Sequence, residues 1–195
     1  MVLDIRAEGK NGVSVLYRRN SMTKKTSHHG SRATPAVQTL SRAGVPFTIH
    51  TFEIPTHGDG AGYGMAAASA LGVEPDRVFK TLVVAVSGSA HPHVVAIVPV
   101  SRQVNLKALA HVLSAKRAEL LDGADAERLT GYVVGGISPF GQKRVLPTVI
   151  DTSARSWPSI FVSAGRRNAD VEVRPEDAIA VLEATVADIA ERGWT

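Results

Sequence analysis

Two continuous apolar runs joined by a short polar segment constrain the fold of this chain more than any other feature. The first run, FKTLVVAV, covers residues 79–86, and the second, HVVAIVPV, covers 93–100. β-Branched residues dominate both runs, and neither run alternates with polar residues as a strand with one solvated face would. We therefore predict two strands that are buried on both faces and joined by a hairpin turn at Ser87 to His91.

Helices and further strands are predicted on both sides of this hairpin. Thr34 offers a capping hydroxyl, Pro35 suits the first helical position, and Gly44 is a natural stop. The mixed order of elements differs from a regular βαβ alternation and favours an α+β fold with one mixed sheet. Helices are predicted at 35–43, 63–71, after Asn105, at 124–129 and from Pro175. The buried stripe of the last helix is expected to reach Val186. Strands are predicted at 46–52, 79–86, 93–100, 116–120, 146–151, 159–163 and 170–173.

Composition narrows the classes of function. The 195 residues include no cysteine and carry a formal net charge of +4. The lack of cysteine excludes a disulfide framework, a thiolate zinc site and a cysteine nucleophile, and it fits a reducing cytoplasm. No apolar run is as long as a membrane span, so no membrane partner is expected. The positive charge favours an anionic partner.

The N-terminal residues are expected to lie outside the folded domain. The segment SMTKKTSHHGSRA is polar and basic, a composition typical of disorder. We predict a disordered tail over residues 1–33 and a single domain over 34–195. Met22 stands shortly before this domain, so Met1 and Met22 both remain candidates for the native start.

Lys80 is the most informative charged residue because it lies near the start of an otherwise apolar strand. One interpretation is a strand-end lysine whose ammonium group reaches water along its aliphatic stem. The other is a cation that a rigid strand holds in a cleft, with the Thr81 hydroxyl beside it, as a binding or catalytic site requires. The residues alone leave both interpretations open.

Gly135 and Gly136 follow a short apolar segment and also allow two interpretations. They could form a bulge or a turn. Alternatively, their bare backbone N–H groups could face a substrate carbonyl on which negative charge develops. The later turn SAGRRNAD would then form another wall of the same cleft, with Ser163 and Asp170 as polar contacts and with Arg166 or Arg167 facing phosphate.

No residue pattern supplies an obvious catalytic base, nucleophile or cofactor site. Ser138 lies in GISPFG, which lacks the spacing of a nucleophile elbow. His91 and His93 sit at a hairpin turn without a nearby carboxylate, so no metal site is expected there. His50 alternates with apolar neighbours and is expected to be a packed core histidine. No phosphate-binding loop or dinucleotide fingerprint occurs, so we predict no metal and no cofactor.

Five segments together resemble the YbaK/EbsC-type Cys-tRNA(Pro) deacylases, which are free-standing relatives of the editing domain of bacterial prolyl-tRNA synthetases. The segments are TPAVQTL, IHTF, VFKTLVVAV, LTGYVVGGISPFGQKRVLPTVID and IFVSAGRR, in this order, and the resemblance covers about residues 34–191. It implies a single α+β domain with a curved, barrel-like mixed sheet flanked by helices. It also implies a trans-editing aminoacyl-tRNA deacylase that hydrolyses mischarged Cys-tRNA(Pro), with Cys-tRNA(Cys) as a further candidate substrate.

The resemblance also implies roles for individual residues. Lys80 matches the pocket lysine on which activity in the family depends most, and Gly135 matches the first glycine of the G-G-I-S-P motif. The expected catalytic residues are Lys80, Gly135 and Gly136. The expected substrate contacts are Tyr63, Thr81, Ser163 and Asp170, and the expected tRNA phosphate contacts are Lys143, Arg144, Arg166 and Arg167.

The resemblance implies why no catalytic base is needed and which partners the protein has. In the cysteine-specific relatives, the thiol of the substrate is thought to attack the carbonyl itself. The expected partners are the 3′ acceptor end of an aminoacylated tRNA and prolyl-tRNA synthetase. Two alternatives stay open: a deacylase for Ala-tRNA or another small aminoacyl-tRNA, and a non-catalytic module that binds tRNA or a synthetase. Phe52 replaces a tyrosine of many relatives, and Ala164 and Asn168 replace two glycines, which leaves the amino-acid preference open.

Overall fold

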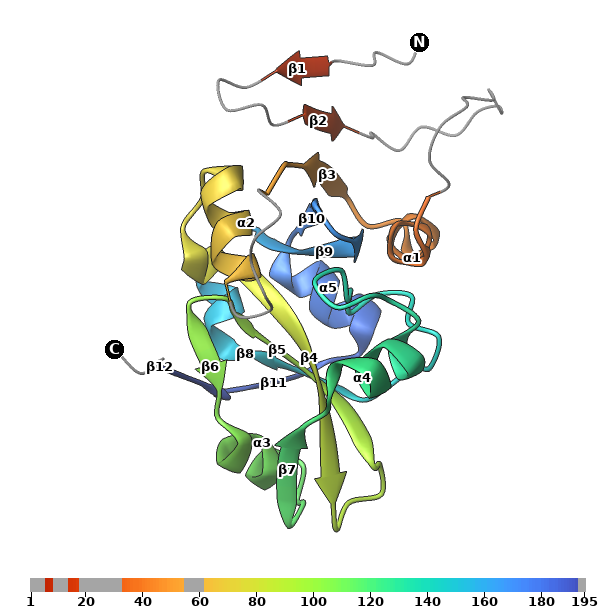
Figure 1. Cartoon of the computed structure of the whole chain (residues 1–195), viewed down its shortest axis with the longest axis vertical. Coiled ribbons are helices and arrows are strands. Elements are labelled where there is room, and N and C mark those ends of the chain that lie inside the picture. The colour runs from red at the N-terminus through yellow and green to blue at the C-terminus, as the bar shows by residue number, and fades with distance from the viewer. Residues whose placement is uncertain (1–5, 9–13, 18–32, 55–61, 193–195) are drawn as a thin grey trace.

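The computed structural model describes residues 6–8, 14–17, 33–54 and 62–192, and most of its strands join one mixed sheet (Figure 1). The order in that sheet is β1-β2-β3-β10-β9-β4-β5-β8-β11, β7 also pairs with β4, and β12 pairs separately with β6. The strands are β1 Arg6–Glu8, β2 Ser14–Tyr17, β3 Phe47–Thr51, β4 Val78–Ser87, β5 His93–Pro99, β6 Arg102–Val104, β7 Arg117–Leu120, β8 Thr148–Asp151, β9 Ile160–Arg166, β10 Ala169–Val173, β11 Thr185–Ala187 and β12 Ala190–Arg192.

Helices cover both faces of this sheet. The α-helices are α1 Pro35–Ala43, α2 Tyr63–Leu71, α3 Leu106–Val112, α4 Gly123–Thr130 and α5 Pro175–Leu182, and the short 3-10 helices are η1 Pro75–Arg77 and η2 Thr152–Ser156. Helices α2 and α3 pack on the face that carries Val78 and Val84. Helices α1 and α5 pack on the opposite face with Phe79, and α4 contacts Val83 there. The layers confirm the predicted α+β domain with helices flanking a mixed sheet.

Local sequence signals explain where several helices begin and end. The Thr34 side chain accepts a hydrogen bond from the Val37 N–H, and Gly44 ends α1 in the left-handed conformation with φ of +69°. The Asp122 side chain caps α4 by accepting from the Asp125 N–H. Helix α1 therefore has the bounds that the sequence predicts.

The hairpin of β4 and β5 forms the centre of the sheet, as predicted. The two strands are antiparallel, with Lys80 opposite Val98 and Val84 opposite Val94. Val84, Val94 and Val98 are completely buried. The apolar runs therefore place this hairpin correctly in the interior.

The second edge of β4 changes partner along its length. At its start, β4 is parallel to β9, with Val78 opposite Phe161. At its end, β4 is antiparallel to β7, with Val84 opposite Leu120. Among the described strands, residues 80–83 pair with β5 alone, so the sheet divides beside them. Lys80 lies at the start of this stretch of the central strand.

The structure corrects two predictions. Residues 6–8 and 14–17 were assigned to a disordered tail, but they form β1 and β2, and β2 pairs with the free edge of β3. The other residues of 1–32 lie outside the described residues. Val186 was placed on the last helix, but α5 ends at Leu182, because Glu183 adopts a left-handed conformation with φ of +49°. Val186 belongs to β11 instead.

The described helices include none that is long and apolar enough to cross a membrane.

Candidate functional site

Four polar side chains form a row across one face of the divided sheet. Asp170 on β10 lies directly opposite His50 on β3 and Ser163 on β9. Because β4 is parallel to β9 with Val78 opposite Phe161, Lys80 and Ser163 lie two residues further along the two strands, on the same face. Strands β3 and β4 and the consecutive strands β9 and β10 therefore contribute to one polar row, which ends at the division of the sheet.

Lys80 is half-buried at the end of this row. Burial lowers the pKa of its ammonium group, because removal from water disfavours the charged form. Among the described residues, no carboxylate forms an ion pair with Lys80. A half-buried cation without a protein counter-ion is suited to hold an anionic group of a ligand.

Asp170 is the buried acid of the row, with 7% of its surface exposed. Desolvation raises the pKa of its carboxyl group to about 7, and the nearby His50 partly opposes this shift. A neutral carboxyl group can donate a hydrogen bond as well as accept one. Asp170 can therefore donate a hydrogen bond to a polar group of a ligand at neutral pH, which an exposed, ionised aspartate cannot do.

A network beside the row holds His50 in place. Its Nε2 atom lies 2.9 Å from the Glu172 carboxylate, which also accepts from Arg77 at 2.8 Å and from Ser159. The hydrogen bond with His50 is the main reason that the pKa of Glu172 falls to about 2. The His50 ring also packs edge-to-face on Phe161. His50 is thus a part-buried, packed residue with a fixed hydrogen-bond partner.

Tyr63 anchors α2 to the turn between β9 and β10. Its phenolic oxygen accepts from the Asn168 N–H at 2.6 Å and donates to the Asn168 side-chain oxygen at 3.1 Å. Burial is the largest contribution to the raised pKa of Tyr63. Asn168 has a left-handed conformation, with φ of +61°. The Tyr63 hydroxyl therefore shapes the site by fixing this turn.

Thr81 lies on the face opposite to Lys80. It pairs with the buried Ile97, and its own exposure is 9%. Its hydroxyl oxygen has no hydrogen-bond partner among the described residues. Contact of Thr81 and Lys80 with one ligand would therefore require entry at the division between β4 and β9.

The two adjacent glycines form a tight turn that packs against the turn between β9 and β10. The Gly136 N–H donates to the Val133 carbonyl at 2.8 Å, so this group is already occupied. A Cβ atom at Gly136 would lie 2.8 Å from the Arg166 carbonyl carbon and 2.9 Å from the Arg167 nitrogen. The close approach that requires a glycine at position 136 is therefore made by the chain itself. Gly135 has φ of +82°, and its N–H is the one that remains a candidate oxyanion donor.

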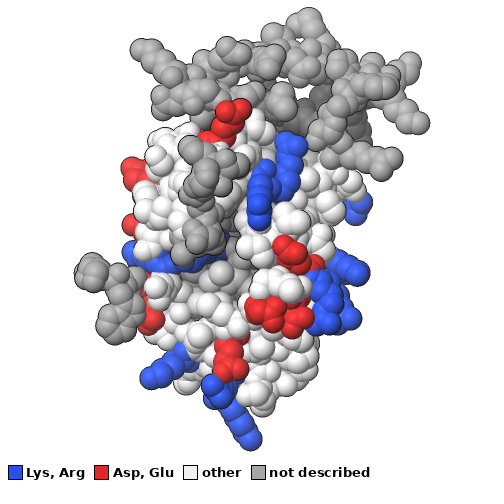
Figure 2. All heavy atoms as spheres, viewed as in Figure 1, with Lys and Arg blue, Asp and Glu red and all other residues white. Residues whose placement is uncertain are grey.

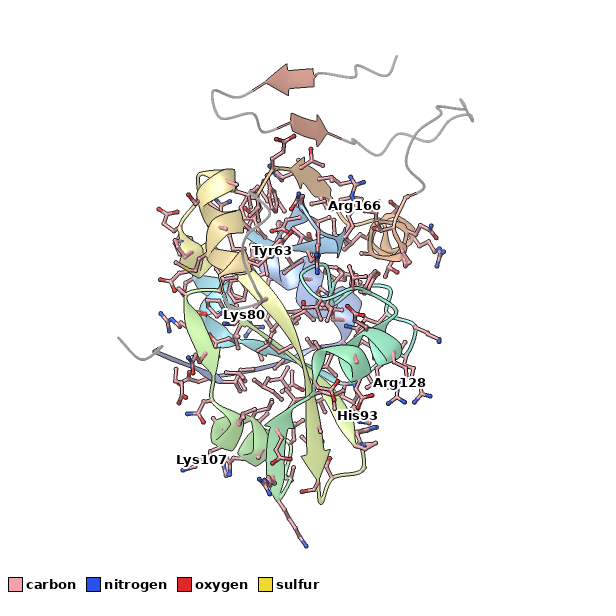
Figure 3. All side chains as sticks on the ribbon, in the orientation of Figure 1. Tyr63, Lys80, His93, Lys107, Arg128 and Arg166 are labelled. Carbon is pink, nitrogen blue, oxygen red and sulfur yellow. The ribbon has the colours of Figure 1, made fainter. Side chains whose placement is uncertain are left out.

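The four predicted phosphate contacts are all exposed. Arg166 ends β9 and Arg167 follows it, whereas Lys143 and Arg144 lie in the loop between α4 and β8. On the face seen in Figure 2, cationic side chains lie in separate groups rather than in one continuous belt. Figure 3 places Tyr63 and Arg166 in the upper part of the view, Lys80 near its middle and Lys107 in the lower part.

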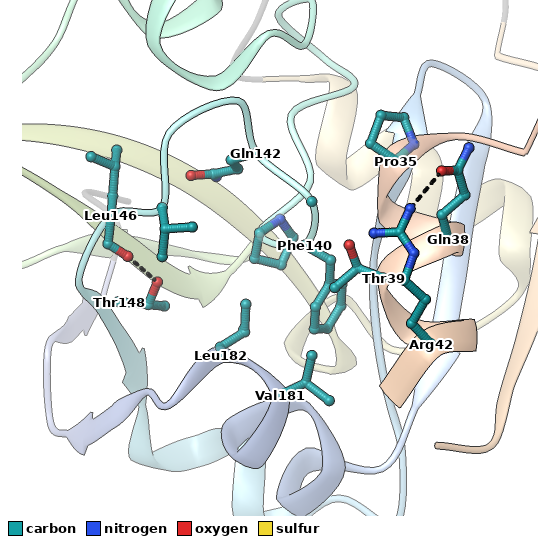
Figure 4. Close-up of a pocket in the computed structure, with 13 residues that line it drawn as sticks. Pro35, Gln38, Thr39, Arg42, Phe140, Gln142, Leu146, Thr148, Val181 and Leu182 are labelled. Atoms are coloured by element: carbon teal, nitrogen blue, oxygen red, sulfur yellow. Dashed lines mark hydrogen bonds between the residues drawn. The ribbon is translucent and has the colours of Figure 1, made fainter. Parts of the chain in front are cut away.

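A groove of about 360 Å³ lies elsewhere, between α1, the loop before β8 and the end of α5 (Figure 4). Phe140, Leu146 and Leu182 supply apolar surface there, and Arg42 with Gln38 supplies polar groups. None of the predicted catalytic or substrate-binding residues lines it. We therefore place the candidate site at the polar row, where the chemical groups converge, rather than at this groove.

Among the described residues, no group of three or more His, Cys, Asp or Glu side chains could hold a metal ion.

Sequence reasoning missed several residues that support the site. Glu172 and Arg77 hold His50, and Glu127 accepts a hydrogen bond from the Val134 N–H at 2.7 Å. Glu172 had a detectable signal, since it is a charged residue two positions after Asp170 within a predicted strand. Arg77 gave no comparable signal because its partners, Ser159 and Glu172, are distant in sequence.

The sequence is similar to those of known aminoacyl-tRNA editing proteins. The family model described as aminoacyl-tRNA editing domain matches residues 61–181. The chain is 37% identical over 127 residues to EbsC of Enterococcus faecalis, named as a candidate Cys-tRNA(Pro)/Cys-tRNA(Cys) deacylase, covering 65% of this chain and 76% of that protein. It is 29% identical over 146 residues to the multifunctional Ser/Thr-tRNA deacylase ProXp-y of Escherichia coli K12, covering 74% of this chain and 84% of that protein.

Solved structures share the fold. A candidate trans-editing enzyme for prolyl-tRNA synthetase aligns with a TM-score of 0.67 and 22% identity, covering 80% of this chain and 95% of that chain. The hypothetical protein APE2540 aligns with a TM-score of 0.71 and 24% identity, covering 81% of this chain and 100% of that chain. The family match spans more than half of the sequence, and the similarity to EbsC is independent of it. The chain therefore belongs to the aminoacyl-tRNA editing domain family.

Proposed function

We propose that this editing-domain protein is a trans-editing deacylase that hydrolyses mischarged Cys-tRNA(Pro), and that Cys-tRNA(Cys) is a second substrate. The observation that carries the proposal is the half-buried Lys80, which has no ion pair with any described residue and lies at the end of the row formed with Ser163 and Asp170. The similarity to EbsC, whose name specifies these two substrates, supports this choice of amino acid.

Each residue of the row has a proposed role. Lys80 binds a phosphate or the terminal nucleotide of the tRNA through its ammonium group. Ser163 and Asp170 contact polar groups of the aminoacyl moiety. The Gly135 N–H donates to the carbonyl oxygen of the ester when this oxygen becomes negatively charged. Thr81 remains a substrate contact only for a ligand that enters where β4 and β9 separate.

The substrate supplies the nucleophile in this mechanism. The sulfur of the cysteinyl group attacks its own ester carbonyl, forming a C–S bond, and the C–O bond to the tRNA ribose breaks. The thiol proton passes to the departing ribose oxygen, and water later opens the cyclic thioester. The protein orients the ester and stabilises the oxyanion. A chain without cysteine can therefore support thiol chemistry.

A seryl or threonyl ester is the second candidate substrate, because ProXp-y is named a Ser/Thr-tRNA deacylase. A hydroxyl group is a much weaker nucleophile than a thiol at neutral pH. Hydrolysis of these esters would therefore proceed by direct attack of water. An alanyl ester lacks both groups and would also require water.

We also propose that prolyl-tRNA synthetase is a partner and that the protein acts in the cytoplasm, where aminoacyl-tRNA is made and used. Lys143, Arg144 and Arg166 are exposed and can attract phosphates without reading sequence. Selection of the proline tRNA then falls to the synthetase. The name of one structural neighbour, a candidate trans-editing enzyme for prolyl-tRNA synthetase, supports this partner.

The test is a deacylation panel of cysteinyl-, seryl-, threonyl-, alanyl- and prolyl-tRNA, each with and without prolyl-tRNA synthetase. The proposal expects rapid loss of the cysteinyl ester only, with S-methylcysteinyl-tRNA resistant because its sulfur cannot cyclise. Hydrolysis of seryl or alanyl esters at the cysteinyl rate would favour the water mechanism. Binding of charged tRNA without loss of any ester would indicate a non-catalytic module.

A further inference from the structure

The turn that carries Gly135 contains a peptide group that can point in two directions. The Gly136 N–H bonds to the Val133 carbonyl at 2.8 Å, Gly135 has φ of +82°, and Val134 is not among the residues with positive φ. This combination defines a type II β-turn with Val134 and Gly135 at its centre. Type I and type II turns differ mainly in the direction of this central peptide. An interaction elsewhere in the structure must therefore favour the orientation that is observed.

Two side chains hold this turn from opposite ends of Val134. Arg167 Nε donates to the Val134 carbonyl at 2.9 Å, and Glu127 accepts from the Val134 N–H at 2.7 Å. The Val134 carbonyl and the Gly135 N–H belong to the same peptide group. Since that peptide is trans, its N–H points away from its carbonyl oxygen and hence away from Arg167 Nε. No acceptor for the Gly135 N–H occurs within the part of the chain that the structure describes.

We propose that Arg167 is a positioning residue that fixes the Val134–Gly135 peptide, so that the Gly135 N–H is presented to the ester carbonyl as an oxyanion donor. The inference rests on the proposed deacylase function, and it replaces the phosphate contact that the sequence suggested for Arg167. A donor with a fixed direction stabilises negative charge without reorienting during the reaction. Rotation of the peptide would instead turn the Val134 carbonyl oxygen towards the developing charge and repel it.

The substitution Arg167→Lys separates positioning from phosphate binding. Lysine keeps the positive charge but has no Nε donor at the place where arginine has one. The variant is expected to bind aminoacyl-tRNA with unchanged affinity and unchanged salt dependence. Its single-turnover rate constant for deacylation should fall by about tenfold, as the loss of one hydrogen bond to a charged group predicts.

The matched control is Arg128→Lys. Arg128 is an exposed arginine of α4 that pairs with Asp125, and it has no role in the proposed site. This variant is expected to have the wild-type rate. If Arg167→Lys also reacts at the wild-type rate, or loses only tRNA affinity, Arg167 does not position the peptide and the proposal is overturned.

A second measurement does not depend on activity. In NMR spectra of protein labelled with ¹⁵N, the Gly135 amide should be sharp in the wild type and broadened by microsecond-to-millisecond exchange in Arg167→Lys and Arg167→Met. The Arg128→Lys spectrum should match the wild type at Gly135. An unchanged Gly135 signal in both Arg167 variants would overturn the positioning role, even if wild-type protein hydrolysed no ester and the proposed function had failed.

Discussion

Replacement of Gly136 by alanine is predicted to destabilise the protein because the fold leaves no room for a methyl group. An ideal Cβ atom there would lie 2.8 Å from the Arg166 carbonyl carbon, 2.9 Å from its Cα atom and 2.9 Å from the Arg167 nitrogen. All three neighbours are backbone atoms, so no side-chain rotation can relieve the contact. Gly136 is not among the glycines with positive φ, so the penalty is steric rather than conformational.

The magnitude follows from two opposing contributions. Overpacking a well-packed region typically costs about 1–3 kcal/mol, and displacement of backbone favours the upper part of that range. Alanine also reduces the entropy of the unfolded chain, which returns about 0.4–1 kcal/mol. The net loss is therefore about 1–2 kcal/mol. For a domain of this size, this corresponds to a decrease in Tm of roughly 2–8 °C.

Urea unfolding followed by circular dichroism measures the effect, with Gly62→Ala as the matched control. A Cβ atom at Gly62 would meet nothing within 4 Å, and Gly62 does not have positive φ. The control introduces no backbone clash and should therefore destabilise the protein less than Gly136→Ala does. If Gly136→Ala unfolds at the same urea concentration as wild type, the glycine turn and the turn between β9 and β10 are not in close contact.

Three further predictions concern charged groups of the site. Lys80→Met should keep or raise the Tm, because a desolvated cation is removed. It should lower the single-turnover rate constant by about a hundredfold, as the loss of one electrostatic contact to the reacting group predicts. A wild-type rate would exclude Lys80 from the site. Asp170 has its pKa raised to about 7 by burial, so its contribution to stability is complete below its unfolded pKa and is lost as the pH rises through 7. The free energy of unfolding of the wild type, measured by urea titration at each pH, should therefore decrease between about pH 4 and pH 7. The Asp170→Asn variant should not show this decrease. Glu172 has its pKa lowered to about 2, so its contribution is present above its unfolded pKa and is lost as the pH falls through 2. Glu172→Gln should be less stable than wild type at pH 7 by about 1–2 kcal/mol and equally stable near pH 2; a constant difference across this range would contradict the assignment.

Elements with strong local signals were predicted correctly from the sequence. The apolar runs of β4 and β5 required burial on both faces, and Thr34, Pro35 and Gly44 defined α1 to the residue. The bounds of β9 were less accurate, because the strand continues to Arg166 through Gly165 instead of ending at Ser163. Its last residue, Arg166, pairs with Ala169 of β10 across a turn of two residues, which is shorter than the turn that the sequence indicated.

The sequence suggests individual residues for the candidate site, but it does not indicate how they are arranged relative to one another. Lys80 and Asp170 were named before the structure, yet the row that they share with Ser163 depends on strand register across β4, β9 and β10. Thr81 was expected beside Lys80, although strand alternation places consecutive residues on opposite faces. The hydrogen bond of Arg167 to Val134 joins segments that no local pattern connects.

The adjacent glycines therefore meet two different physical demands, although the sequence presents them as a pair. Gly136 allows the backbone at Arg166 to approach, which fixes the distance between the glycine turn and the end of β9. Gly135 supplies the positive φ of the turn and leaves one N–H without an acceptor in the described chain. Because β9 also carries Ser163, backbone contact sets the position of the free N–H relative to the polar row. A reaction whose nucleophile arrives with the substrate depends on such positioning more than on a basic side chain.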